Sequence, residues 1–371
     1  MVDLHGQYIK IKDEVDNAIQ RVIDSTDFIR GEDVRSFQEE LSIYLDVKYT
    51  VACGNGTDAL QVALMALELE PGDEIITTPL TFIATVEVIR LLGLKPVFVD
   101  VKPDTFNMDP EHLEQAVTER TRAIIPIHLF GQCAEMESIM EFARVYGLYV
   151  IEDNAQALGA DFTPAGGSNL KAGTIGHMGT TSFFPSKNLG AFGDGGALFT
   201  NDESFAVRAA SLVNHGMKIR YHYDHVGVNS RLDTIQAAIL RVKLKHLDEY
   251  HRLRQEAAAR YDMSLAGIDD IQIPARSTFT THIFHQYTLQ VEMSRRDKLK
   301  QWLMEKGIPS QVYYPLPLHL QRAYRGLGYR EGDFPVSEAL CLRVLSLPMH
   351  TELENEQLDY ISDQVHHFFK S

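Results

Sequence analysis

Lys187 stands where a buried strand gives way to a run of glycines. The apolar residues before it end at Pro185, and glycines follow it at positions 190, 193, 195 and 196. A lysine held at a strand end, with glycines that admit a flat group beside it, is suited to forming a Schiff base through its amine. Most lysines are solvated at the surface, but the place of this one between a strand and the glycines argues against that role.

A carboxylate ends a second apolar strand upstream, at Asp153. An anion beside a protonated pyridine nitrogen raises the pKa of that nitrogen and keeps it protonated. A Schiff-base lysine and such an aspartate are the minimum apparatus for the chemistry of pyridoxal phosphate, whose ring accepts electrons from a carbanion. Taken alone, Asp153 could equally be a helix cap or one half of a surface ion pair.

The loop 54–58 joins a predicted strand to a predicted helix and contains Gly56 and Thr57. Backbone amides and a hydroxyl at a helix N-terminus bind anions, so this loop is a natural seat for the cofactor phosphate. A plain tight turn with a capped helix is the commoner meaning of such a loop by itself. Ser182, shortly before Lys187, would add a hydroxyl to the phosphate site or be an inert strand serine.

Two further side chains are candidates for contacts with a flat ring. Phe82 follows the next predicted strand and could stack on a heteroaromatic ring, although a lone phenylalanine is more often part of the core. Gln156 lies three residues after Asp153. Its amide could bond a phenolic oxygen or cover one face of the ring.

Composition and charge limit the class of protein. The 371 residues are 44% hydrophobic and 23% charged, which is ordinary for a globular protein and enough for two domains. The net charge of −16 argues against nucleic acid or an anionic membrane surface as a partner. The three cysteines are odd in number and far apart, and they fit neither a disulfide framework nor a zinc site. No signal region or membrane-length apolar run is present, so we expect a soluble, cytoplasmic protein without a metal.

Strands and helices alternate over the first part of the chain, which predicts a mostly parallel sheet with helices on both faces. The predicted strands are 49–53, 74–78, 95–101, 123–129, 148–151, 180–184 and 197–200. The predicted helices are 8–24, 32–45, 56–69, 82–92, 110–117, 135–146 and one long helix from 232 to 261. Residues 159–174 have few apolar side chains and predict an exposed loop.

After Asp262 the regular alternation of strands and helices ends, and the pattern predicts a smaller α+β domain. Strands are predicted at 283–291 and 310–314, and a helix at 297–306. A capping box at 351–354 predicts the start of a last helix that runs toward Phe369. The predicted domains are therefore 1–245 and 246–371, with the boundary at the long helix.

The ordered set of motifs resembles the DegT-type sugar aminotransferases of nucleotide-sugar biosynthesis, which share the aspartate aminotransferase fold (fold type I). The resemblance covers nearly the whole chain. It is carried by Glu152-Asp153-Asn-Ala-Gln156, Ser182-Phe-Phe-Pro-Ser-Lys187-Asn-Leu-Gly, Gly227-Val-Asn229-Ser-Arg231-Leu-Asp-Thr-Ile-Gln-Ala-Ala, Tyr313-Tyr-Pro-Leu-Pro-Leu-His319 and Leu345-Ser-Leu-Pro-Met-His350.

The resemblance implies a role for each matching residue. Lys187 would form the internal Schiff base, and Asp153 would pair with the pyridine nitrogen. Gln156 and Phe82 would flank the ring, and the phosphate would be held by Gly56, Thr57 and Ser182. Asn229 is expected to reach the phosphate of a neighbouring subunit, which implies a homodimer with shared active sites. Some family members carry histidine in place of the lysine and are dehydratases, so the lysine kept here implies transamination.

The full-length resemblance is strongest to enzymes that aminate C3 of a UDP-linked 2-acetamido-3-keto-hexuronic acid for surface polysaccharide, with glutamate as the expected donor. An amine freed from the Schiff base can move a proton between the two reacting carbons. Substrate contacts are expected from Lys218 and Arg220 in a basic aromatic loop, from Arg231 opposite a sugar carboxylate, and from Tyr314 and His319.

Two other functions remain open at this stage. The first is amination of a dTDP-linked 3-keto-6-deoxyhexose. The second is a regulatory protein that binds the cofactor without turnover, against which the intact Lys187 and Asp153 argue.

Overall fold

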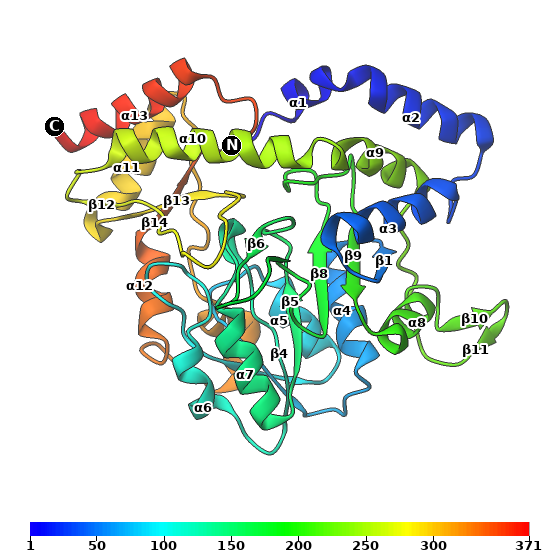
Figure 1. Ribbon diagram of the computed structural model, residues 1–371. Coiled ribbons are helices and arrows are strands. Elements are labelled where there is room, and N and C mark those ends of the chain that lie inside the picture. The colour runs from blue at the N-terminus through cyan, green and yellow to red at the C-terminus, as the bar shows by residue number, and fades with distance from the viewer. Residues whose placement is uncertain (371) are drawn as a thin grey trace.

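A computed structural model describes residues 1–370, which form a large central sheet, a smaller sheet and the helices that cover them (Figure 1). The large sheet has seven strands in the order β1–β9–β8–β5–β4–β2–β3. Only β9 runs antiparallel to its neighbours, so the predicted α/β fold with a mostly parallel sheet is confirmed. The strands are β1 Tyr49–Cys53, β2 Glu74–Thr77, β3 Lys95–Phe98, β4 Thr121–Ile124, β5 Tyr149–Asp153, β8 Met178–Ser182 and β9 Gly196–Thr200.

Successive residues of these strands point to opposite faces of the sheet, and both faces are apolar. Ile75 and Ile151 pack on one face under α4 (Gly56–Ala66), α5 (Ala84–Leu91) and α8 (Glu203–Leu212). Ile76 and Val150 pack on the other face against α7 (Met136–Tyr146). The short η1 (Pro110–His112), α6 (Leu113–Ala116) and η2 (Leu129–Gly131) lie in the connections on this side.

The N-terminal helices cover the end of the sheet near β1. Helix α3 (Glu32–Leu45) buries Phe37 and Leu41 against β9 and α9 (Thr234–Leu244). Helix α2 (Lys12–Ser25) packs Val15 and Val22 on the other side of α9, and α1 (Leu4–Lys10) precedes it.

The smaller sheet is antiparallel, in the order β12 (Ile271–Gln272), β13 (Tyr287–Val291), β14 (Val344–Leu347). Its apolar face packs with α10 (Leu247–Leu265), α11 (Met293–Glu305) and α13 (Asn355–Lys370). The remaining elements are η3 (Leu318–Leu320), η4 (Arg322–Leu327) and α12 (Pro335–Arg343). We propose the division 1–245 and 246–371, because residue 245 lies at the break between α9 and α10.

Several details differ from the sequence-based expectation. The predicted helix 8–24 is divided between α1 and α2, and the predicted strand 283–291 begins at Tyr287. The single long helix 232–261 is two helices. No strand forms at 310–314, where Gln311 makes only an isolated bridge to Ser346. The last helix begins at Asn355, because the hydroxyl of Thr351 bonds Glu352 instead of capping the helix. The predicted loop 159–174 contains the strand pair β6 (Asp161–Phe162) and β7 (Leu170–Lys171).

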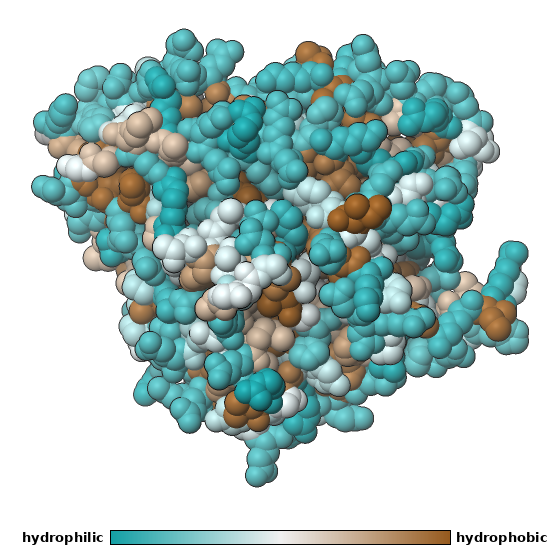
Figure 2. All heavy atoms as spheres, in the orientation of Figure 1, coloured by the Kyte–Doolittle hydropathy of each residue, from teal (hydrophilic) through white to brown (hydrophobic). Residues whose placement is uncertain are grey.

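A hairpin arm made of β10 (Met217–Ile219) and β11 (His222–Tyr223) projects from the body beside α8 (Figures 1 and 2). Its side chains are unusually exposed for their type, with Ile219 at 69%, Tyr221 at 70% and Tyr223 at 60%. Among the described helices, none is long and apolar enough to cross a membrane.

Candidate active site

A cavity of about 640 Å³ opens at the carboxyl ends of the parallel strands, where ligands bind in open α/β sheets. Lys187 and Asp153 both line it, with segments of the large and small domains around them. Eight of the predicted site residues are brought together here, namely Gly56, Thr57, Phe82, Asp153, Gln156, Ser182, Lys187 and Tyr314.

One end of the cavity is built as an anion site. Helix α4 begins at Gly56, and its first turn is capped by Asn55, whose side chain accepts a hydrogen bond from the amide of Asp58 at 2.8 Å. Ser182 ends β8 directly opposite, and a Cβ on Gly56 would lie 2.6 Å from the Cβ of Ser182. The glycine therefore lets Ser182 pack closely against the helix N-terminus, so that the backbone amides and the serine hydroxyl lie together where a phosphate would bind.

Asp153 is buried at the end of β5 and fixed by two hydrogen bonds. Its Oδ2 accepts from the hydroxyl of Thr85 at 2.8 Å, and its Oδ1 accepts from the amide of Ala155 at 3.2 Å. Both bonds fix the orientation of the carboxylate. A fixed anion at this place suits the task of holding a protonated ring nitrogen.

Lys187 follows β8 in a turn in which its amide donates to the carbonyl of Phe184 at 2.8 Å. Burial lowers the pKa of its amine to about 8, while the nearby Asp153 opposes that change. An amine with this pKa is partly uncharged near neutral pH, as a nucleophile and proton acceptor must be.

Gln156 connects the cavity wall to the small domain. Its side-chain oxygen accepts from the amide of Phe130 at 2.8 Å, and its amide group donates to the hydroxyl of Tyr314 at 3.3 Å. Burial raises the pKa of Tyr314, so this hydroxyl stays protonated. The ring of Phe82 is 56% exposed and lies 6.5 Å from the Tyr314 ring, which leaves an aromatic face free beside the cavity.

The other predicted contacts lie outside this cavity. Lys218 and Arg220 belong to the projecting arm, and Asn229 is exposed beyond it. Arg231 lines a separate small hollow with Arg30. Within one chain, none of these four residues reaches Lys187.

His319 is buried away from the cavity in the small domain. Its Nε2 lies 2.9 Å from a carboxylate oxygen of Glu338, and its ring packs against Phe334. The fold thus gives His319 a packing position that its place in the matching motif did not reveal.

Several residues that line the cavity or hold its lining residues carried no sequence signal strong enough to assign them. Thr85 was visible only as a helix residue near Phe82, and its bond to Asp153 needs the tertiary fold. Tyr313, His285 and Gln286 also line the cavity. They come from the small-domain part of the chain, whose approach to Lys187 is invisible in local patterns.

A buried cluster behind Asp153 has the side-chain types of a metal site. His128 Nε2 lies 2.7 Å from Glu152, and the thiol of Cys133 lies 3.8 Å from the same nitrogen. The His128 Nδ1 accepts from the amide of Ala134, so the proton is on Nε2 and points at Glu152. Glu152 also accepts from three backbone amides of residues 173–176. These bonds occupy the lone pairs that a metal would need, and the cluster is a structural network.

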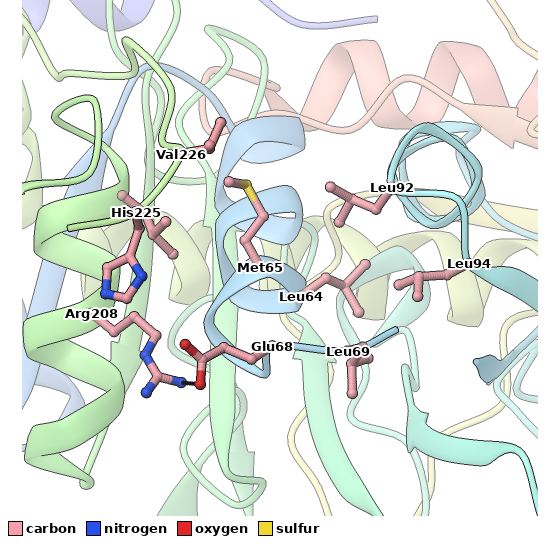
Figure 3. A pocket seen from close by; sticks show the side chains of 10 residues that line it. Leu64, Met65, Glu68, Leu69, Leu92, Leu94, Arg208, His225 and Val226 are labelled. Atoms are coloured by element: carbon pink, nitrogen blue, oxygen red, sulfur yellow. Dashed lines mark ion pairs between the residues drawn. The ribbon is translucent and has the colours of Figure 1, made fainter. Parts of the chain in front are cut away.

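A second hollow lies at the opposite end of α4 (Figure 3). Leu64, Met65 and Leu69 face it, and Glu68 forms an ion pair with Arg208 at 3.0 Å. Its polar lining is the Glu68–Arg208 ion pair and His225, and its described residues include no counterpart of the Lys187 and Asp153 pair.

Comparison with known proteins gives a consistent result. The DegT/DnrJ/EryC1/StrS aminotransferase family matches residues 9–366. A pleiotropic regulatory protein of Geobacillus stearothermophilus is 45% identical over 372 residues, which cover 100% of this chain and 98% of that protein. The UDP-2-acetamido-2-deoxy-3-oxo-D-glucuronate aminotransferase of Pseudomonas aeruginosa is 44% identical over 360 residues, which cover 97% of each chain.

The structure of S. venezuelae DesV in complex with a ketimine intermediate superposes with a TM-score of 0.95 at 39% identity. The superposition covers 100% of this chain and 98% of that one. The whole fold is therefore shared, including both sheets.

Proposed function

The chain belongs to the DegT/DnrJ/EryC1/StrS aminotransferase family, and we propose that it moves an amino group from glutamate to C3 of a UDP-linked 2-acetamido-3-keto-hexuronic acid. It is a pyridoxal phosphate-dependent aminotransferase that acts on nucleotide-linked keto sugars. The sugar and the donor are the proposed part. The observation that carries them is the 44% identity, over 97% of both chains, with an aminotransferase named for such a uronate.

The residues of the cavity fit pyridoxal phosphate. The N-terminus of α4 at Gly56, with the Ser182 hydroxyl packed against it, suits its phosphate, the half-exposed ring of Phe82 offers a face for stacking, and the fixed carboxylate of Asp153 suits its ring nitrogen. When bound, the cofactor supplies a carbonyl carbon for amines and a ring that accepts electrons from a carbanion.

The residues in and next to the cavity have different roles in the proposed reaction. Thr85 and the amide of Ala155 hold the carboxylate of Asp153 in place. Gln156 is held by Phe130 and Tyr314, so its side chain forms a fixed wall of the cavity. Lys187 supplies the amine that anchors the cofactor and, once released, takes a proton at Nζ from one reacting carbon and returns it to the other.

A cofactor-binding regulator without turnover is the competing function, because a relative of equal similarity is named as a regulatory protein. Incubation of the yellow, purified protein with glutamate separates the two. We expect its visible absorbance to fall as the bound cofactor becomes pyridoxamine phosphate, and 2-oxoglutarate to appear in equal amount. A spectrum that stays unchanged at saturating glutamate would favour the regulator.

We further propose a homodimer with shared sites. Asn229, Lys218 and Arg220 are exposed and lie away from the Lys187 cavity of their own chain. The arm that carries the two basic residues also exposes apolar side chains that a second copy would bury. The arm and Asn229 of one chain would then complete the cavity of the other, and the arm's cations would meet the diphosphate of the sugar nucleotide.

A further inference from the structure

Residues 282–286, which we call the clamped segment, join the small domain to the wall of the active-site cavity. The backbone of Ile283 donates to the carbonyl of Gly131 at 2.9 Å and accepts from the side chain of Asn188 at 3.2 Å. The carbonyl of Phe284 accepts from the buried Arg254 at 3.0 Å. The segment is therefore fixed by hydrogen bonds to the loop that contains Lys187, to η2 and to α10.

Backbone strain is concentrated at the same place. Phe284 and Phe130 have positive φ angles of 49° and 60°, which are unusual for residues with a side chain. Gly131 has φ 109°, and a Cβ there would lie 2.8 Å from the backbone nitrogen of His285. Such strain persists only where the surroundings fix it, and it is common at functional sites.

The clamped segment places His285 in the wall of the cavity. This residue is 7% exposed and lines the cavity with Lys187. Its Nδ1 is buried and has no hydrogen-bond partner among the described residues. A buried polar atom without a partner is costly, and on a residue that lines an active site it points to a group that arrives during the reaction.

The charges around His285 keep its ring neutral. Burial is the largest cause that lowers the pKa of His285, and the positive charges of Lys187 and Arg254 lower it further. Asp153, Asp194, Tyr313 and Tyr314 also line the cavity. A neutral imidazole has one ring nitrogen that accepts a hydrogen bond, which an ammonium or amine group can donate.

We propose that His285 receives the amine of Lys187 while that amine is free, and holds it by a hydrogen bond in position for proton transfer. His285 is thus a positioning residue that acts through Lys187, and the inference rests on the proposed role of this lysine. While the amine is free, Asp153 would pair with the cofactor ring and would not be available to the amine. A neutral acceptor must therefore bind the amine in its place. The flexible stem of Lys187 lets the amine move between the two places.

The test measures the protonation of Lys187 directly. Protein loaded with pyridoxamine phosphate, in which this amine is free, is labelled with acetic anhydride over a range of pH. Mass spectrometry of the digest then gives the uncharged fraction of Lys187. Loss of an acceptor destabilises the ammonium form, so His285→Leu should move the labelling midpoint down by about 1 to 2 pH units. His285→Asn, which keeps an acceptor, should leave the midpoint close to that of the wild type.

His282→Asn is the matched control. His282 is also buried in the clamped segment, but its Nδ1 accepts from the amide of Phe284 and its ring stacks on Phe284. This change should lower the melting temperature and leave the Lys187 midpoint unchanged. An unmoved midpoint in His285→Leu, or an equal shift in the control, would overturn the proposal. Labelling needs no turnover, so this failure is distinct from a failure of glutamate to change the spectrum.

Discussion

Lys187 is kept in surroundings that favour its uncharged form. Burial brings the pKa of its amine down to about 8, and Asp153 prevents a larger decrease. The activity should therefore depend on pH. The free amine must be uncharged to take a proton, so its contribution should grow as pH rises through about 8 and fade below it.

Replacement of Lys187 by alanine should abolish both the visible absorbance of the bound cofactor and most turnover. The fold should remain, because the change removes a buried amine that makes no side-chain hydrogen bond in the described structure. Absorbance spectra, turnover and far-ultraviolet circular dichroism measure the three effects. Normal activity in this variant would contradict the mechanism.

Thr85→Val removes the hydrogen bond to Asp153 while keeping the shape of the side chain. Loss of a bond to a charged group costs about 1.5–3 kcal/mol, which corresponds to roughly 10- to 150-fold in rate if the bond supports the ionised form throughout. We expect kcat to fall within this range and Asp153→Asn to be more severe. Thr85→Ser keeps the hydroxyl and should recover most of the rate.

Arg231→Lys tests the proposed sugar, which this arginine would reach only across the proposed dimer, because it lies outside the Lys187 cavity of its own chain. A bidentate pair of arginine with the C6 carboxylate is planar, and lysine replaces it poorly. The uronic substrate should lose roughly 10- to 150-fold in kcat/KM, and a 6-deoxy sugar, which has no carboxylate, far less.

Equal losses for both sugars would give Arg231 a general structural role. A wild-type preference for the 6-deoxy sugar would overturn the proposed substrate and leave the aminotransferase activity intact.

Sequence patterns reached several residues of the cavity wall because these follow strand ends, where local sequence and site geometry coincide. Lys187, Asp153 and Gly56 are of this kind. His285 and Thr85 could not be assigned, because their roles depend on contacts with residues far away in the chain. The position of Arg231 in a hollow beside Arg30 was likewise beyond a local pattern.

At the scale of elements, Asp100 links the two parts of the chain. It follows β3, and its carboxylate caps α12 of the small domain by accepting from the amides of Val336 and Ser337 at 2.9 Å each. It also accepts from the Ser337 hydroxyl at 2.6 Å. A carboxylate at a helix N-terminus satisfies free amides and interacts favourably with the helix dipole.

Asp100→Ala should lower the free energy of unfolding by about 2 kcal/mol, at the upper end for a lost cap, because the amides left behind are buried. Asp202→Ala is the control, since Asp202 caps α8 from an exposed position and should cost about 1 kcal/mol. Urea unfolding measures both. Equal losses would show that burial of the cap contributes little.

Errors in the predicted elements also have physical causes. The break between α9 and α10 contains Lys245 and His246, and neither is a helix breaker, so the periodicity continued across it. The stretch 310–314 contains a valine and two tyrosines, which are common in strands, but only Gln311 finds a partner, at Ser346. Strand pairing depends on distant residues, which a local pattern does not include.

At the scale of the whole molecule, the proposed dimer predicts complementation between two inactive variants. Asn229→Ala and Lys187→Ala proteins should each be impaired alone. After mixing and exchange of subunits, heterodimers carry one site with both residues intact, so activity should return to a substantial fraction of the wild type.

Two controls accompany this experiment. A mixture of Lys187→Ala with Asp153→Ala places both defects in the same half of the site and should regain nothing, because each heterodimer lacks one residue in every cavity. Sedimentation of the wild type as a stable, active monomer would contradict shared sites altogether.

If the proposed dimer buries the exposed side chains of the hairpin arm, Ile219, Tyr221 and Tyr223, the stability of the fold depends on protein concentration. A chain whose arm is buried by a second copy gains free energy only while that copy is bound, so its melting temperature should rise with protein concentration. Dilution would then reduce heat resistance and activity together. In a cell that makes little of this protein, part of it would then be separate chains, each with an incomplete cavity and an arm whose apolar side chains are exposed.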